Sequence, residues 1–176
     1  MPTKQPDAIA LLKEDHRKVE GLFERFEKTR DDARKTSIVK DICTELIIHC
    51  LIEEELFYPT FRGRVEDELL DEAHVEHDGA KMLIAELLES EPGAPFYDAK
   101  VSVLSEEIKH HVKEEERPGK GLFAQARATG EDLNMLGERM RSRKEELKAQ
   151  FAAKGLPTPV SRSLVGAQLK HGEPVG

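Results

Sequence analysis

The chain has 176 residues, a length that suits one domain with a buried core. Because 35 acidic residues outnumber 27 basic ones, the net charge of −8 argues against a nucleic-acid partner, which would need a basic face. No apolar run is long enough to cross a membrane, and the N-terminus lacks a signal-peptide pattern, so we expect a cytoplasmic protein with no membrane partner.

Apolar residues recur at helical spacing along most of the chain, and strand signals are nearly absent. In chain order we predict long helices over residues 7–29, 33–58, 65–89 and 97–116, a short helical piece over 122–128, and a last long helix over 130–154. Proline and glycine end several of these helices, as at Pro59, Pro92-Gly93 and Pro118-Gly119.

We therefore predict an all-α protein, an up-down-up-down four-helix bundle with an additional C-terminal helix and a tail. Residues 1–128 form the bundle, residues 129–154 an accessory helix packed on it, and residues 155–176 an extended or disordered tail. The apolar stripe of the accessory helix leaves both a monomer and a homodimer open. Cys43 and Cys50 lie ~10 Å apart along a helix, too far for a disulfide, and are predicted to be small buried residues.

Histidine or glutamate interrupts the apolar stripe of each of the four bundle helices. The interrupting residues, at three- and four-residue steps on one helix face, are His16, His49, Glu53, His77, His111 and Glu115. A buried carboxylate without a partner is costly, whereas a divalent cation compensates its charge and is commonly bound by imidazole and carboxylate. The pattern predicts a metal site inside the bundle; the alternative is a structural bundle with buried His–Glu hydrogen bonds.

Two of these helices carry a histidine followed four residues later by a glutamate: His49 with Glu53, and His111 with Glu115. The glutamate then lies ~40° round and ~6 Å along the same helix face, so one pair can offer a nitrogen to one ion and a carboxylate that bridges to a second. The second pair lies 62 positions after the first, and the histidines of the first and third helices are 61 positions apart. This repeat predicts two hairpins related by a pseudo-two-fold axis about two ions.

The sequence resembles the hemerythrin-like family, the HHE cation-binding domains, over residues 8–128. The matching segments, in order, are DHRKVEGLFERFE, HCLIEEELFYP, AHVEHDGAKMLI and KHHVKEEE. The resemblance implies a cofactor of two non-haem iron ions, oxo- or hydroxo-bridged; the spacing alone would also allow manganese or zinc. It implies that the protein binds or processes dioxygen, nitric oxide or peroxide, in oxidative or nitrosative stress, with enzymatic turnover left open. The alternative is a metal-dependent iron or oxygen sensor, an iron-binding module without turnover.

The chain departs from the oxygen-carrying members of that family at the seventh ligand. Those proteins have two histidines four apart on the third helix, whereas His74 and His77 are three apart and diverge by ~60°. We predict His74 as the seventh ligand, with Glu54, Tyr58 or solvent as alternatives. The remaining acidic neighbours are expected on a solvated face, from which one could bond a ligand imidazole: Glu54, Glu55, Glu114 and Glu116.

Overall fold

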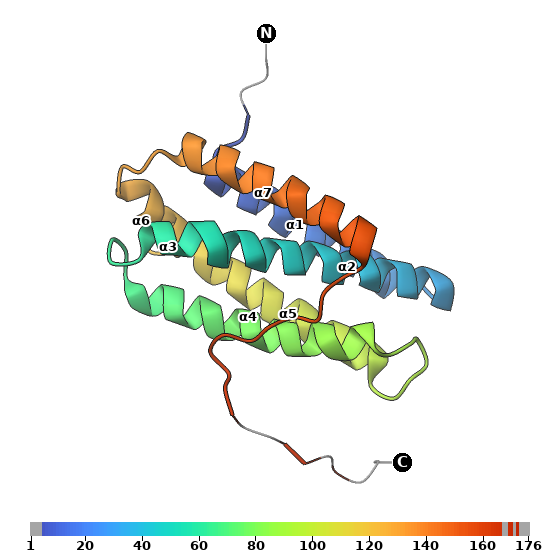
Figure 1. Cartoon of the computed structure of the whole chain (residues 1–176). Coiled ribbons are helices and arrows are strands. Elements are labelled where there is room, and N and C mark those ends of the chain that lie inside the picture. Colours follow the sequence, from blue (N-terminus) through green and yellow to red (C-terminus); the bar gives the residue numbers. More distant parts are fainter. Residues whose placement is uncertain (1–4, 167–168, 171, 173–176) are drawn as a thin grey trace.

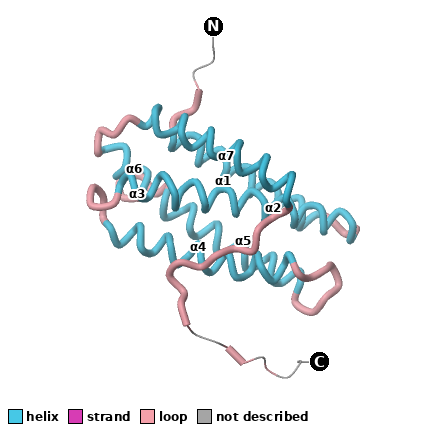
Figure 2. The backbone as a smooth tube through the Cα atoms, viewed as in Figure 1, coloured by secondary structure: helices cyan, strands magenta, loops and turns pink. Residues whose placement is uncertain are grey.

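The computed structural model describes residues 5–166, 169–170 and 172, and within these residues every regular element is helical (Figure 2). In chain order the elements are α1 (Ala8–Lys28), α2 (Asp32–Ile52), the π-helical segment η1 (Glu53–Phe57), α3 (Tyr58–Phe61), α4 (Asp67–Leu88), α5 (Tyr97–Glu115), α6 (Leu122–Ala128) and α7 (Leu133–Lys154). The predicted all-α class is confirmed. No helix of the described residues is both long and apolar enough to span a bilayer.

Four long rods form the bundle: α1, α2 with its continuation through η1 and α3, α4 and α5 (Figure 1). Neighbouring rods run antiparallel, and α7 lies along α1 and α2 on the side away from α4 (Figure 1). At Gly137, α7 packs closely against the start of α1, because an added Cβ would stand 2.7 Å from the backbone nitrogen of Ala8. A residue without a side chain therefore lets the two backbones approach one another.

Side-chain caps start three of the helices. Asp7 accepts a hydrogen bond from the Ala10 amide at 2.9 Å, and Asp31 accepts one from the Arg34 amide at 2.8 Å. Asp132 caps α7 in the same way. Each carboxylate satisfies a backbone N–H that the first helical turn leaves without a partner, which explains why the predicted starts lie within three residues of the observed ones.

The second predicted helix differs from the observed one at its C-terminal end. We expected a single helix ending near Pro59, but α2 ends at Ile52, η1 follows, and α3 continues to Phe61. The Tyr58 amide bonds the carbonyl of Glu53, five residues earlier. Pro59 stands within the first turn of α3, where its missing N–H costs no hydrogen bond, so the rod passes the proline instead of stopping there.

Apolar side chains from every long helix meet in one continuous core. Cys43 and Cys50 are buried free thiols within the bundle, as the sequence predicted. After α7 the chain runs as an extended segment across the face of the bundle towards α4 (Figure 1). Residues 167–168, 171 and 173–176 of the predicted tail lie outside the described residues.

Candidate metal centre

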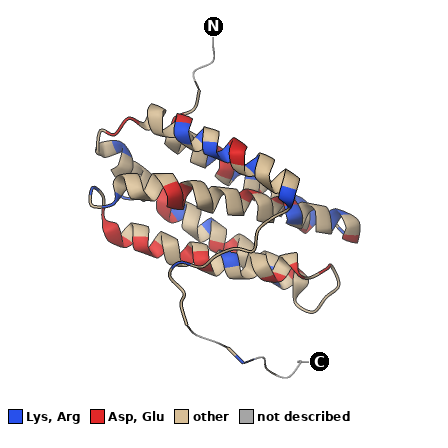
Figure 3. Ribbon diagram, viewed as in Figure 1, with Lys and Arg blue, Asp and Glu red and all other residues tan. Residues whose placement is uncertain are grey.

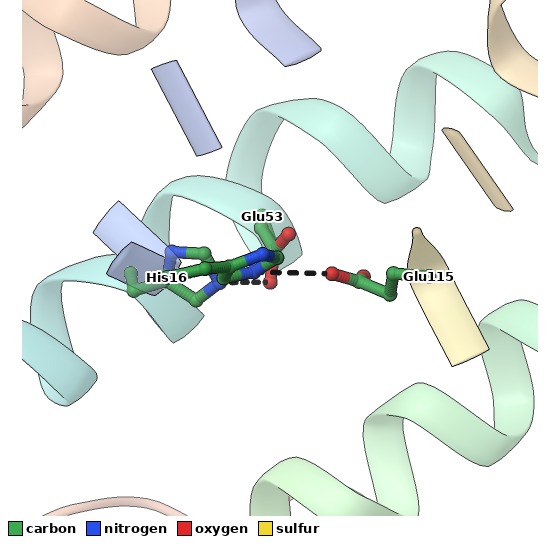
Figure 4. Close-up of side chains that lie close together, drawn as sticks. His16, Glu53 and Glu115 are labelled. Carbon is green, nitrogen blue, oxygen red and sulfur yellow. Dashed lines mark hydrogen bonds and ion pairs between the residues drawn. The ribbon is translucent and has the colours of Figure 1, made fainter. Parts of the chain in front are cut away.

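The six histidines and glutamates predicted from the apolar stripes converge in the middle of the bundle. Each is buried, with no more than 4% of its surface exposed. Four rods supply them: α1 (His16), α2 with η1 (His49 and Glu53), α4 (His77) and α5 (His111 and Glu115). Figure 4 shows His16, Glu53 and Glu115 pointing toward one another from separate parts of the chain.

The four imidazoles form two pairs that meet through their Nε2 atoms. His16 Nε2 lies 3.2 Å from His49 Nε2, and His77 Nε2 lies 3.3 Å from His111 Nε2. The two rings of each pair are tilted by the same interplanar angle, 57°. The predicted repeat is thus visible in the geometry, because each half of the chain contributes one complete pair of imidazoles.

The two glutamates lie between the imidazole pairs. Glu53 Oε2 is 3.1 Å from His49 Nε2 and 3.3 Å from His77 Nε2. Glu115 Oε2 is 3.4 Å from the Nε2 of His16 and 3.5 Å from that of His111. Each carboxylate therefore faces one imidazole of each pair, which is the placement that a carboxylate shared between two ions requires.

The donor set fits two divalent cations. The ligand atoms of His16, His49, Glu53 and Glu115 lie within 4.8 Å of one another, and those of Glu53, His77 and His111 do so in a second group. Among the described residues, Glu53 Oε1 and Glu115 Oε2 are buried oxygens without a hydrogen-bond partner. Such oxygens are costly in a protein interior unless a cation is bound to them. Nitrogen and carboxylate donors together suit iron, manganese or zinc.

Four further carboxylates, here called the outer carboxylates, face the Nδ1 atoms of the four imidazoles. Two of them belong to the acidic residues that directly follow the site glutamates. Glu116 Oε1 lies 2.7 Å from His16 Nδ1, and Glu54 Oε1 lies 3.0 Å from His77 Nδ1. Because a carboxylate accepts, each Nδ1 donates, and the lone pair of Nε2 is left for a cation. The predicted solvated face is wrong for Glu54, which lies in η1 and is buried.

The other two outer carboxylates directly precede the site histidines of α1 and α4. Glu76 Oε2 lies 2.7 Å from His111 Nδ1, and Asp15 Oδ2 lies 3.7 Å from His49 Nδ1. Together with the preceding pair, all four imidazoles have a carboxylate behind them. Four of the six predicted site residues, namely His16, Glu53, His77 and Glu115, have an acidic residue directly beside them, and this is the sequence signal that would have revealed the outer carboxylates.

Electrostatic pairing within the cluster shifts the pKa values of its members. Burial opposes ionisation of Glu53, but His49 and His77 outweigh it and hold the pKa of that carboxyl well below its ordinary value. Burial likewise opposes charge on His49, and Glu53 with Asp15 raises its pKa well above the ordinary value. Without a metal, the cluster therefore holds protons on imidazoles that a bound cation must displace.

Tyr58, and not His74, faces the cluster. The Tyr58 hydroxyl lies 3.1 Å from both Glu53 Oε2 and Glu115 Oε1, and 3.2 Å from His77 Nε2. In a regular α-helix a residue five positions after Glu53 would point ~140° away, and the π turn brings it back to the same face. His74 instead bonds the Leu70 carbonyl through Nδ1 at 2.7 Å and lies in neither ligand group.

Helices outside the four-helix bundle also contact the centre. Lys144 of α7 forms a buried ion pair with Asp15, the carboxylate behind His49. Phe123 of α6 stacks on the His16 ring, with centroids 5.8 Å apart. Sequence reasoning missed both residues, because their spacing along the chain carries no information about the distant helix that they touch.

A small cavity of about 10 Å³ lies beside the imidazoles, with room for about one water-sized molecule. Its lining combines the imidazoles and Asp15 with one thiol and four aliphatic side chains: Asp15, His16, Val19, Leu46, His49, Cys50, His77, Ile108, His111 and Val112. The centre can therefore accommodate a molecule of very few atoms and excludes larger substrates.

Comparison with known proteins gives one family. The family described as the hemerythrin HHE cation binding domain matches residues 7–118. A DNA nickase of Nostoc sp. is 28% identical over 117 residues, which are 66% of this chain and only 32% of the nickase. An uncharacterized protein of Mycobacterium tuberculosis is 27% identical over 143 residues, 81% of this chain and 88% of the relative. The crystal structure of a hemerythrin HHE domain-containing protein from Mycobacterium kansasii has a TM-score of 0.72 and 26% identity, covering 86% of this chain and 96% of that one.

Proposed function

Since the chain belongs to the hemerythrin HHE cation-binding domain family, we propose that its buried centre holds two non-haem iron ions and handles dioxygen, nitric oxide or peroxide. The observation that carries the proposal is the position of two carboxylates, each between two imidazole pairs. Iron bound there would supply redox chemistry toward these small oxidants.

In this proposal the buried imidazoles, carboxylates and tyrosine hydroxyl are the protein donors to the two ions. His16 and His49 would hold one ion, and His77 and His111 would hold the other. Glu53 and Glu115 would supply carboxylate oxygens to the ions, and the Tyr58 hydroxyl would be the seventh protein donor. The outer carboxylates keep the Nδ1 proton in place and thereby aim each Nε2 at the ions.

The cavity of about 10 Å³ beside the imidazoles supports a very small molecule as the ligand. Val19, Leu46, Ile108 and Val112 form an aliphatic wall that offers no hydrogen bond. On that side of the cavity a charged substrate would lose its hydration without compensation. Because the aliphatic side of the cavity supplies no proton to a ligand that lies against it, we propose reversible binding as the main activity and place peroxide breakdown second.

Anaerobic reconstitution with Fe(II), followed by metal analysis, tests the proposal. We expect two irons per chain, and separate exposure to dioxygen, nitric oxide and hydrogen peroxide should identify the ligand from the optical spectra. Glu53→Gln should lose bound iron, while Glu55→Gln, a neighbouring variant outside the cluster, should retain it. A folded protein that holds no transition metal would refute the proposal, and preferential uptake of manganese or zinc would replace iron in it.

We also propose that the protein works in the cytoplasm, in keeping with an oxidant-handling role. The two cysteines, Cys43 and Cys50, are free thiols, the form that a reducing compartment maintains. Fractionation of the source cells, with the metal content of each fraction measured alongside, would test this location.

A further inference from the structure

Two outer carboxylates in equivalent positions of the repeat differ in their exposure to solvent. Glu116 and Glu54 each follow a site glutamate and each accept a hydrogen bond from a site imidazole. The Glu116 side chain is 21% exposed, whereas that of Glu54 is 1% exposed. The repeat alone would give both the same surroundings, so an element outside the repeat must cover Glu54.

The covering element is the extended segment after α7, residues 157–164, here called the strap. Its course across the bundle is visible in Figure 1. The strap is fastened at one buried carboxylate, Asp78 of α4. The hydroxyls of Ser161 and Ser163 donate to Asp78 Oδ2 at 2.9 and 2.6 Å. The backbone amides of Arg162, Ser163 and Leu164 donate to the same oxygen at 2.8, 2.5 and 3.2 Å.

These hydrogen bonds to Asp78 place Arg162, a cation of the strap, against Glu54, the outer carboxylate of His77. Arg162 Nε forms an ion pair with Glu54 Oε2 at 2.7 Å. The other oxygen of Glu54 accepts from His77 Nδ1 at 3.0 Å and from Lys81 Nζ at 2.6 Å. Lys81 also lies 3.3 Å from Asp78 Oδ1, so two cations and two carboxylates compensate one another at this spot.

The rest of the strap is not close-packed on the bundle. A cavity of about 230 Å³ separates part of it from α2 and α4, with a wall that includes Ile47, Leu51, Pro157, Pro159 and Val160. Most strap residues are exposed. Figure 3 shows acidic residues along α4, the helix that the strap crosses. A segment with few buried apolar contacts has low local stability, so its position depends on the bonds to Asp78 and Glu54.

We propose that the strap is a working part of the metal centre, in which Arg162 acts as a positioning residue for His77. Arg162, held in place by Asp78, fixes Glu54, and Glu54 fixes the orientation and the Nδ1 proton of His77. The ion on the His77 side is therefore slower to leave than the ion on the His16 side, whose outer carboxylate is open to water. The inference rests on the proposed metal centre but not on iron or on oxidant chemistry.

Metal release from the cobalt-loaded full chain tests the inference. Co(II) absorbs in the visible range when bound by imidazole and carboxylate, so its removal by excess EDTA can be followed directly. We expect two phases in the wild type. In Arg162→Gln and Asp78→Asn we expect the slower phase to be about tenfold faster. Loss of a group that hydrogen-bonds a metal ligand typically weakens metal binding about 10- to 100-fold, and we expect the lower end of that range. Arg162→Lys should restore part of the slow phase, and Lys154→Gln, which changes an exposed cation of α7, should match the wild type.

Trypsin cleavage after Arg162 provides a second readout that does not depend on metal chemistry. We expect slow cleavage there in the wild type and fast cleavage in Asp78→Asn. If Asp78→Asn fails to fold, Arg162→Gln carries the release test, because the Arg162 side chain is 49% exposed and its loss removes no core contact. Equal release rates in Arg162→Gln and wild type would overturn the inference and leave the metal centre standing. A chain that takes up no cobalt would overturn both.

Discussion

The buried ion pair between Lys144 of α7 and Asp15 of α1 leads to a prediction of how much the free energy of unfolding falls when the pair is broken. The Lys144 and Asp15 side chains are 11% and 7% exposed, and the second Asp15 oxygen lies 3.7 Å from His49 Nδ1. Lys144→Met keeps most of the length of the side chain and removes its charge. The substitution leaves the buried Asp15 carboxylate with His49 as its remaining charged neighbour. Because one partner of a buried ion pair is then missing, we expect the free energy of unfolding to fall by about 3–5 kcal/mol.

A matched pair on the same helix provides the control. Arg143 of α7 bonds Glu55 at 2.7 Å, but the two side chains are 34% and 30% exposed. Solvent screens this pair, so Arg143→Met should cost about 0.2–1 kcal/mol. Denaturant unfolding of the metal-free proteins at neutral pH measures both losses. The double variant with Asp15→Asn should recover part of the Lys144→Met loss, because the buried charge is then gone.

The pKa of Asp15 determines how the stability difference between wild type and Lys144→Met changes with pH. Burial opposes ionisation of Asp15, but His49 and Lys144 outweigh it and lower the pKa of the carboxyl below its ordinary value of 3.8. The stability from this pair is therefore present above that value and is lost as the pH falls through the folded-state pKa. The gap between wild type and Lys144→Met should shrink in acid. A loss no larger than that of Arg143→Met, or one that is independent of Asp15, would refute the reasoning.

Tyr58→Phe removes the hydroxyl from both site carboxylates; we expect the fold and the metal content to persist and the optical spectrum of the iron-loaded protein to shift, and an unchanged spectrum would remove Tyr58 from the centre. His74→Ala should keep the wild-type metal content in elemental analysis, because that imidazole bonds a carbonyl of its own helix; loss of one ion would restore His74 as a ligand. Burial opposes charge on His16 and His49, but neighbouring carboxylates raise the pKa values of these two imidazoles above the ordinary 6.5. Stability from these imidazoles is present below 6.5 and is lost as the pH rises through the folded values, while the lowered carboxyl pKa values remove stability in acid. Denaturant midpoints of the metal-free protein should therefore peak between the ordinary carboxyl value of 4.5 and the imidazole value of 6.5, and a midpoint that rises toward alkaline pH would contradict this reasoning.

The sequence determined the bundle and the six histidines and glutamates that point into it. His49 and Glu53, or His111 and Glu115, share a helix face because four residues advance little more than one turn. On a regular helix, spacing alone decides which residues share a face, and a polar residue within an apolar stripe must point inward. The family resemblance added the expectation of iron, which composition and spacing could not supply.

Only the tertiary structure decided the rest of the centre, for two physical reasons. The π turn at η1 breaks the regular spacing, so Tyr58 turned inward although the sequence favoured His74 as the seventh ligand. Lys144 and Arg162 reach the outer carboxylates from segments more than a hundred residues away from Asp15 and Glu54 along the chain. Helical periodicity shows which face of its own helix a residue lies on. Which distant residue it contacts depends on how whole helices and segments pack against one another.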